Sequence, residues 1–89
     1  MDDAEIRERI DALDGWALHG ATIRKDFDRG DFAGSVAFLN ALTPAAEGMN
    51  HHPDIEISWK TVTVSLTTHS ADGLTEADFE LAGKIDALA

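Results

Sequence analysis

The stretch Ile55-Glu-Ile-Ser-Trp59-Lys-Thr-Val62-Thr-Val-Ser-Leu-Thr-Thr-His69 decides the fold class of this chain. Apolar and polar side chains alternate from Val62 to His69, and successive side chains of a strand point to opposite faces of a sheet. One face of this predicted strand is therefore apolar and the other polar, and residues 55–59 form its partner in a hairpin. Such a pattern is typical of an antiparallel sheet that helices cover on one face only.

A second predicted hairpin lies nearer the N-terminus. Residues 16–19 form a short strand, Gly20 and Ala21 make the turn, and residues 23–27 form the partner strand. Apolar residues in this partner recur two or four positions apart, which is the spacing of a half-buried strand.

Apolar residues at helical spacing flank the two hairpins. They predict helices over residues 3–13, from Gly30 and Asp31 onward, and from Leu74 to the end of the chain. The second helix carries an apolar stripe made of Phe32, Val36, Leu39 and Leu42. The order αββαββα predicts one α+β domain over residues 1–89, a four-stranded antiparallel sheet with helices packed on one face.

Pro44 falls inside the second helical segment. Proline has no N–H to donate, and its ring clashes with the carbonyl four residues back. We therefore expect a kink or a break between Leu42 and Pro44, and Pro53 ends this helical region for the same reason.

Composition excludes several classes of protein. The 89 residues include no cysteine, so there is no disulfide and no thiolate metal site, and the net charge of −10 argues against nucleic-acid binding. The sequence contains no run of about 18 apolar residues, the length that a membrane-spanning helix needs. The acidic N-terminus lacks a signal-peptide pattern, so we expect a cytoplasmic protein. The abundant Asp is explained by solubility or by a salt-tolerant host.

Three of the four histidines lie at the ends of predicted elements: His51, His52 and His69. Imidazole is the side chain whose ordinary pKa lies nearest neutrality, so such a group suits proton transfer. Glu47 lies four residues before His51 and shares its helix face, where a carboxylate can orient an imidazole. Two other interpretations stay open: His51 and His52 cap the helix C-terminus, and His69 is an exposed residue without a role.

A metal site is a rival interpretation of the same residues. Three histidines with Glu47 suit zinc in number and type. Adjacent histidines diverge, however, and their spacing matches no H-x-x-x-H pattern, so we predict no metal and no cofactor. Asp78 also has two interpretations, because Thr75-Glu-Ala-Asp78 fits a helix capping box.

The chain resembles the pterin-4a-carbinolamine dehydratases in several motifs: Asn50-His51-His52-Pro53, Trp59, Val62-x-Val64-x-Leu66-x-Thr68-His69 and Gly73-Leu74-Thr75-x-x-Asp78. The similarity runs from about Glu47 to Ile85. It implies the αββαββα fold and the loss of water from a 4a-hydroxytetrahydropterin, which gives a quinonoid dihydropterin in tetrahydropterin recycling. This reaction needs an acid and a base, and no metal or redox partner.

The resemblance also implies the site residues. The catalytic set falls on His51, His52, His69 and Asp78, and the substrate-binding set on Glu47, Pro53, Thr67 and Thr68. In this assignment His51 is the acid at the hydroxyl, His69 is the base and His52 positions the ring. Glu47 and Asp78 orient imidazoles.

The expected partners are a small pterin substrate and a second copy of the chain. The family implies a homodimer through sheet edges, sometimes doubled to a tetramer through the second helix, and Pro44 favours the dimer.

The chain departs from some family members at two positions. Ile55 stands where some members carry an aromatic residue, and Ala77 where some carry a basic one; both could shape the pterin pocket. Animal members also stabilise a transcription-factor dimer, so a non-catalytic pterin-binding or protein-interaction homologue is the alternative.

Overall fold

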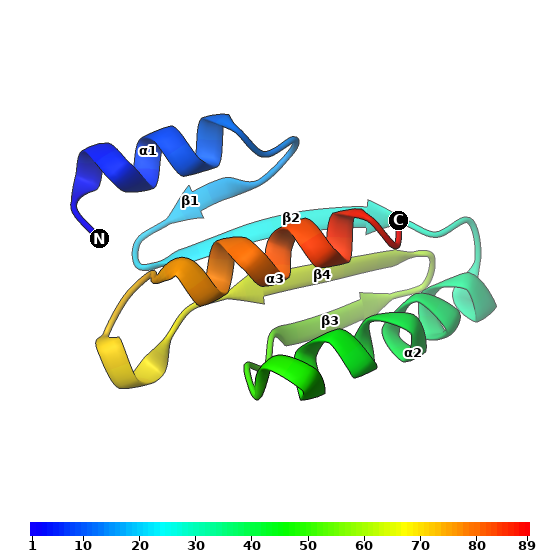
Figure 1. Cartoon of the computed structure of the whole chain (residues 1–89). Helices are drawn as coiled ribbons and strands as arrows, with labels where there is room; N and C mark the ends of the chain where they lie inside the picture. The colour runs from blue at the N-terminus through cyan, green and yellow to red at the C-terminus, as the bar shows by residue number, and fades with distance from the viewer.

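Four antiparallel strands form one sheet in the order β1-β2-β4-β3. The computed structural model describes all residues, 1–89. Its elements follow the predicted order, as Figure 1 shows: α1 (Asp3–Asp11), β1 (Ala17–His19), β2 (Thr22–Asp28), α2 (Phe32–Met49), β3 (Asp54–Ser58), β4 (Thr61–Leu66) and α3 (Glu76–Asp86), with a short 3-10 turn at His69–Ala71. The predicted α+β class is confirmed. None of the helices combines the length and apolar character that crossing a membrane requires.

The two faces of the sheet differ as the alternation predicts. Ile23 of β2 pairs with Leu66 of β4, and both are fully buried, as are Val62 and Val64. On the opposite face Asp26 pairs with Thr63, whose Oγ1 donates a hydrogen bond of 2.7 Å to the Asp26 carboxylate. This face of β2 and β4 therefore stays polar.

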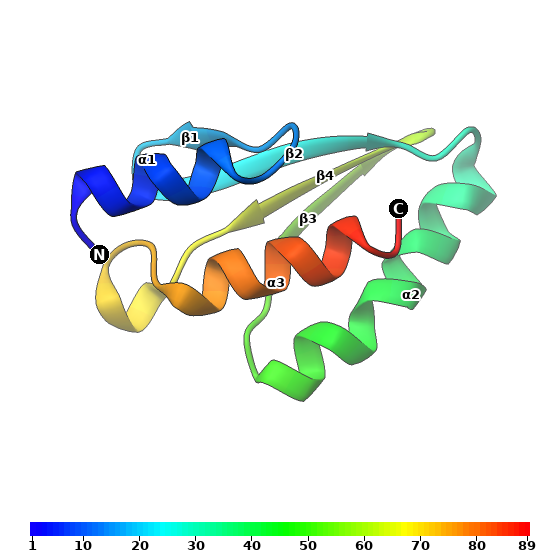
Figure 2. The same ribbon diagram turned by 45° about the horizontal axis from the view of Figure 1, so that its top comes forward.

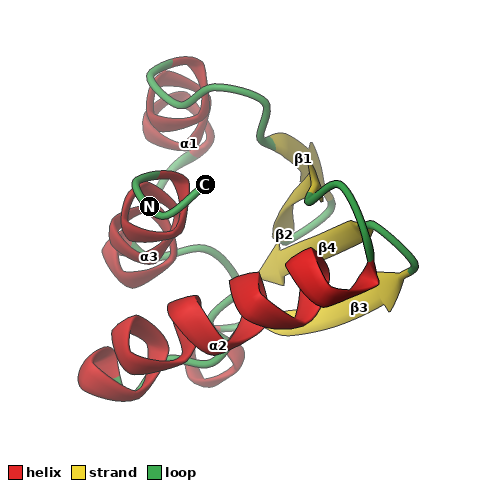
Figure 3. Cartoon of the chain, turned by 90° about the vertical axis from the view of Figure 1, so that its right-hand side faces the viewer, coloured by secondary structure: helices red, strands yellow, loops and turns green.

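The helices cover the apolar face, with α3 lying between α1 and α2 (Figures 2 and 3). The core side chains that the two longer helices supply are Phe38, Leu42 and Ala46 from α2, and Phe79, Leu81, Ala82 and Ile85 from α3. Helix α1 buries no residue. Its Arg9 pairs with Glu76 of α3 and lies over the Phe79 ring, 5.1 Å from the ring centroid.

The buried stripe of α2 matches the predicted one in part, because Leu42 is buried and Leu39 packs against the core. Phe32 and Val36 are 59% and 38% exposed, whereas Ser35 and Phe38 are buried. The Ser35 hydroxyl donates a hydrogen bond of 2.7 Å to the Trp59 carbonyl in the turn between β3 and β4. Ser35 shares the buried face of α2 with Phe38, Leu42 and Ala46, and Phe32 and Val36 lie on the exposed side.

That turn places a large side chain on the surface. Trp59 has a φ of +52° and its side chain is 66% exposed. A bulky residue with positive φ is a strained conformation. The bond from Ser35 holds the turn against α2.

Helix α2 runs without interruption from Phe32 to Met49, so the expected break near Pro44 is wrong. Pro44 cannot donate to the Asn40 carbonyl, but both residues are exposed. Water can therefore satisfy that carbonyl on the outer side of the helix, which reduces the penalty. The Thr43 hydroxyl donates to the Leu39 carbonyl at 2.8 Å in the same stretch.

Strand β4 ends at Leu66 and does not extend to His69, which corrects the predicted strand 62–69. Leu66 pairs with Ile23, and β2 begins one residue earlier, at Thr22. Beyond that point the ladder with β2 ends, and Thr68 pairs instead with Gly73 in an isolated bridge. His69 therefore lies in the 3-10 turn and not on a sheet face.

Candidate functional site

His51 leaves the end of α2 through a backbone reversal. Asn50 adopts the left-handed conformation, with a φ of +48°. The N–H of His51 bonds to the Ala46 carbonyl and that of Asn50 to the Glu47 carbonyl, both at 3.1 Å. This is the bond pattern of a Schellman helix end, and asparagine accepts the left-handed conformation more readily than most residues.

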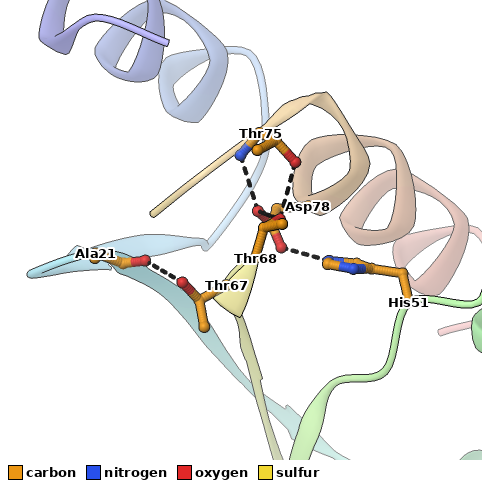
Figure 4. Close-up of polar contacts among 6 residues, drawn as sticks. All are labelled: Ala21, His51, Thr67, Thr68, Thr75 and Asp78. Carbon is orange, nitrogen blue, oxygen red and sulfur yellow. Dashed lines mark hydrogen bonds and ion pairs between the residues drawn. The ribbon is translucent and has the colours of Figure 1, made fainter. Parts of the chain in front are cut away.

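Asp78 receives three hydrogen bonds at the start of α3, drawn in Figure 4. Its side chain is fully buried. The Oδ2 atom accepts from the Thr75 N–H at 2.9 Å and from the Thr68 hydroxyl at 2.7 Å, and the Oδ1 atom lies 2.6 Å from Nε2 of His51. Thr75 and Asp78 form the predicted capping box. The structural interpretation of Asp78 is therefore confirmed, and the same carboxylate also contacts the His51 imidazole.

The contact with Asp78 distinguishes the two ring nitrogens of His51. An ionised carboxylate only accepts hydrogen bonds, so Nε2 carries the proton that faces Oδ1. Nδ1 makes no hydrogen bond, and protein atoms do not enclose it completely. Nδ1 therefore reaches solvent, and it is the His51 atom that can exchange a proton with a bound molecule.

His52 turns away from His51 and pairs with the other carboxylate. Its Nε2 lies 3.0 Å from Oε2 of Glu47, and both side chains are more than half exposed. The prediction that Glu47 neighbours His51 is therefore wrong. The left-handed Asn50 ends the helical geometry, so the four-residue spacing no longer brings Glu47 and His51 together.

A small cavity adjoins the His52–Glu47 pair. It measures about 140 Å³, and its lining includes Glu47, His52 and Pro53. Its other walls are mostly apolar and come from α2 and β3: Leu39, Leu42, Thr43, Ala46 and Ile55. Of the predicted substrate-binding residues, Glu47 and Pro53 thus lie together with His52.

His69 and Thr67 do not join the hydrogen bonds around Asp78. The His69 side chain is exposed and makes no hydrogen bond or ion pair. Thr67 donates its hydroxyl proton to the Ala21 carbonyl at 2.6 Å (Figure 4). Thr68, which directly precedes His69, exchanges backbone hydrogen bonds with Gly73 at 3.0 and 3.3 Å. That bridge closes the loop that carries His69.

Thr75 is a part of the site that the sequence motifs understated. Its backbone N–H holds Asp78, and its hydroxyl oxygen lies 2.9 Å from that of Thr68. The capping-box motif placed Thr75 beside Asp78. Nothing in the motif places the end of β4 over the first turn of α3, and this tertiary arrangement brings Thr68 to the carboxylate.

The metal-ligating side chains stay dispersed. The structure contains no group of three or more histidines and carboxylates that could hold one ion. His51 and His52 each face a different carboxylate, on different helices.

The fold and site define a small α+β domain in which the largely buried imidazole of His51 contacts the fully buried carboxylate of Asp78. Residues 1–88 match the family described as Pterin 4 alpha carbinolamine dehydratase. The chain belongs to this family, which confirms the resemblance seen in its motifs.

Named relatives extend over nearly the whole chain. Proteins of Roseiflexus sp. (strain RS-1) and Sulfurisphaera tokodaii, both provisionally named pterin-4-alpha-carbinolamine dehydratases, are 50% and 49% identical to it. The alignments cover 97% and 99% of this chain and 92% and 95% of the relatives. These names support an enzymatic role for the chain.

Two solved structures share the fold. A crystal structure of a transcriptional coactivator/pterin dehydratase from Brucella melitensis superposes with a TM-score of 0.95 at 35% identity, covering 100% of this chain and 97% of that one. A pterin dehydratase-like protein described as a RuBisCO assembly factor in the alpha-carboxysome superposes with a TM-score of 0.71 at 31% identity, covering 84% and 89%.

Proposed function

We propose that this protein dehydrates a 4a-hydroxytetrahydropterin to the quinonoid dihydropterin and water, in tetrahydropterin recycling. The single observation that carries the proposal is the contact between His51 and the buried Asp78, which leaves Nδ1 of His51 open to solvent. Family membership supplies the substrate class.

The reaction needs two proton transfers. The C4a–O bond breaks, and the leaving hydroxyl takes a proton from an acid and departs as water. The proton on N5 passes to a base, and its bonding electrons form the new C4a–N5 double bond. Each positioned acid or base typically contributes on the order of 10²–10⁴-fold to the rate.

His51 suits the role of the acid in this scheme. The Asp78 carboxylate accepts from Nε2, so a proton on Nδ1 faces away from Asp78 and can be donated to the leaving hydroxyl. His69, exposed on its closed loop, is proposed as the base at N5. His52, held by Glu47, is proposed to position the pterin ring beside Pro53.

The proposal includes a homodimer that works in the cytoplasm. Strands β1 and β3 are the edges of the sheet, and edge strands carry unpaired backbone groups that a second copy can satisfy. The strongly acidic composition suits a protein in solution.

A protein-interaction role without turnover is the second candidate. The outward-facing Phe32 and Val36 on α2 support it, because exposed apolar side chains of this size often mark a binding surface. The structural relative described as a RuBisCO assembly factor shows that the fold also occurs in a protein with an assembly role.

Turnover decides between these candidates. The rate of 4a-hydroxytetrahydropterin dehydration is measured with the folded protein, with a His51→Ala variant and with buffer alone. We expect acceleration by the wild type and loss of most of it in the variant. His19→Ala, which removes an exposed histidine of β1, serves as the matched control and should keep the full rate. A wild-type rate equal to that in buffer would favour the interaction role.

A further inference from the structure

The Thr68 hydroxyl has one proton, and the hydrogen bonds determine where it goes. Its Oγ1 lies 2.7 Å from Oδ2 of Asp78, which can only accept when ionised. The proton of Thr68 therefore points to Asp78, and the neighbouring Thr75 hydroxyl, 2.9 Å away, must donate to Thr68. The result is a directed chain of hydrogen bonds from Thr75 through Thr68 to Asp78, in which each bond polarises the next.

This chain fixes the orientation of a carboxylate that solvent does not reach. The torsion that rotates an Asp carboxylate is broad, so one hydrogen bond alone leaves it free to turn. Here Oδ2 is held at two points, by the Thr75 N–H at the start of α3 and by the Thr68 hydroxyl beyond the end of β4. The backbone bridge between Thr68 and Gly73 keeps that second donor in place. Oδ1 is thereby directed at His51.

We infer that Thr68 is a positioning residue, which acts on the reaction through Asp78 and His51 and does not bind the substrate through its hydroxyl proton. Its effect on turnover rests on the proposed function. A substrate ligand would instead contribute mainly to substrate affinity, so the two roles separate in the kinetic constants.

The test compares three variants of the intact protein. Thr68→Val removes the hydroxyl and keeps the shape, and Thr68→Ser keeps the hydroxyl. Thr63→Val is the matched control, because Thr63 also donates to an aspartate at 2.7 Å, but on the open face of the sheet. Should Thr68→Val not fold, Thr68→Ala replaces it. Circular dichroism establishes that each variant is folded.

Kinetics provide the first measurement. We expect Thr68→Val to lower kcat by roughly 10- to 100-fold, the cost of misplacing a catalytic group, with KM within about two-fold of wild type. Thr68→Ser and Thr63→Val should stay within about three-fold of the wild-type kcat. A Thr68→Val protein with unchanged kcat and a KM raised about ten-fold would overturn the inference and return Thr68 to substrate binding.

Nuclear magnetic resonance provides a measurement that needs no turnover. The proton on Nε2 of His51 lies in a short hydrogen bond, so we expect it to give a downfield imidazole resonance. We expect this resonance to move upfield and to exchange faster with water in Thr68→Val, and to stay in place in Thr68→Ser and Thr63→Val. An unchanged resonance in Thr68→Val overturns the inference even when the wild type is active. A changed resonance with no wild-type turnover refutes the proposed function and leaves the positioning role standing.

Discussion

The Nε2 atom of His51 lies 2.6 Å from Oδ1 of Asp78, although the two residues are 27 positions apart in the chain. His51 follows the C-terminal end of α2, and Asp78 lies in the first turn of α3. A carboxylate is favoured at a helix N-terminus by the partial positive charge there. The contact therefore depends on how the two helices dock, and it forms only in the folded chain.

Replacing His51 should affect both activity and stability. His51→Ala should lower the dehydration rate by on the order of 10²-fold or more. It should also lower the free energy of unfolding by about 1–3 kcal/mol, because the buried Asp78 loses a partner. His69→Ala should lower the rate similarly and change stability by less than about 0.5 kcal/mol, since its exposed side chain has no partner. Denaturant unfolding and initial rates measure both, and full activity in either variant would exclude that histidine from catalysis.

Replacing Asp78 should separate its charge from its capping role. Asp78→Asn keeps an oxygen that can accept from the Thr75 N–H, so we expect a folded protein with a lower kcat. Asp78→Ala also loses the cap, which typically costs about 1 kcal/mol, and it leaves the Thr68 hydroxyl without its acceptor. Thermal unfolding should therefore rank the variants wild type, Asn, Ala. A wild-type kcat in Asp78→Asn would show that the charge is dispensable.

Acid should loosen α1 from α3. The hydrogen bond from Arg9 is the main cause that lowers the pKa of Glu76 below its ordinary 4.5. A lowered pKa contributes stability that is complete above the ordinary value and disappears as the pH falls through the folded value. Because α1 buries no residue, we expect the protection of the α1 amides, corrected for the intrinsic exchange rate, to fall as the pH falls below about 4.5.

The matched variant for this effect is Glu76→Gln. It should show the faster α1 exchange already at neutral pH and no further step in acid, after correction for the intrinsic exchange rate. Equal α1 exchange in the variant and the wild type at neutral pH would show that the Arg9 pair does not hold this helix.

Activity should not depend on a metal. His51 and His52 face separate carboxylates, and the chain has no cysteine. We predict the full dehydration rate after exhaustive treatment with a chelator and removal of the chelator by gel filtration. Stoichiometric zinc in the purified protein, with activity that disappears and returns with the ion, would contradict this prediction.

The protein should assemble as a homodimer. The exposed backbone of β3, an edge strand, offers a pairing surface, and sedimentation at micromolar concentration measures the mass. If tetramers form through the outer side of α2, Phe32→Asp should convert them to dimers and leave the edge contact intact. A monomer under these conditions would contradict the prediction.

Local sequence patterns were sufficient to predict the helices and strands. The alternation from Val62 to Leu66 predicted a one-sided strand, and Thr75 with Asp78 predicted a capping box. Both depend on neighbours in sequence, so short-range periodicity and spacing suffice. The histidine motif likewise identified His51 as a candidate.

The errors concern interactions between distant segments. Phe32 was predicted to be buried but is exposed, whereas Ser35, which the apolar stripe does not include, is buried and bonds to the turn at Trp59. Pro44 is tolerated because its unpaired carbonyl partner faces water. The Thr68–Asp78 bond requires the packing of β4 against α3. No periodicity in the sequence encodes these contacts, and each one depends on where the helices settle on the sheet.

The exposed Trp59 gives the molecule a built-in optical probe of its hairpin. The chain has two tryptophans and no tyrosine, so its near-ultraviolet emission comes from two indoles alone. Trp16 is 5% exposed and donates from Nε1 to Asp86 at 3.0 Å, whereas Trp59 is 66% exposed. Iodide should quench Trp59 and spare Trp16. A Trp59→Phe protein would therefore report, through one buried indole and without any label, when the end of α3 separates from the sheet.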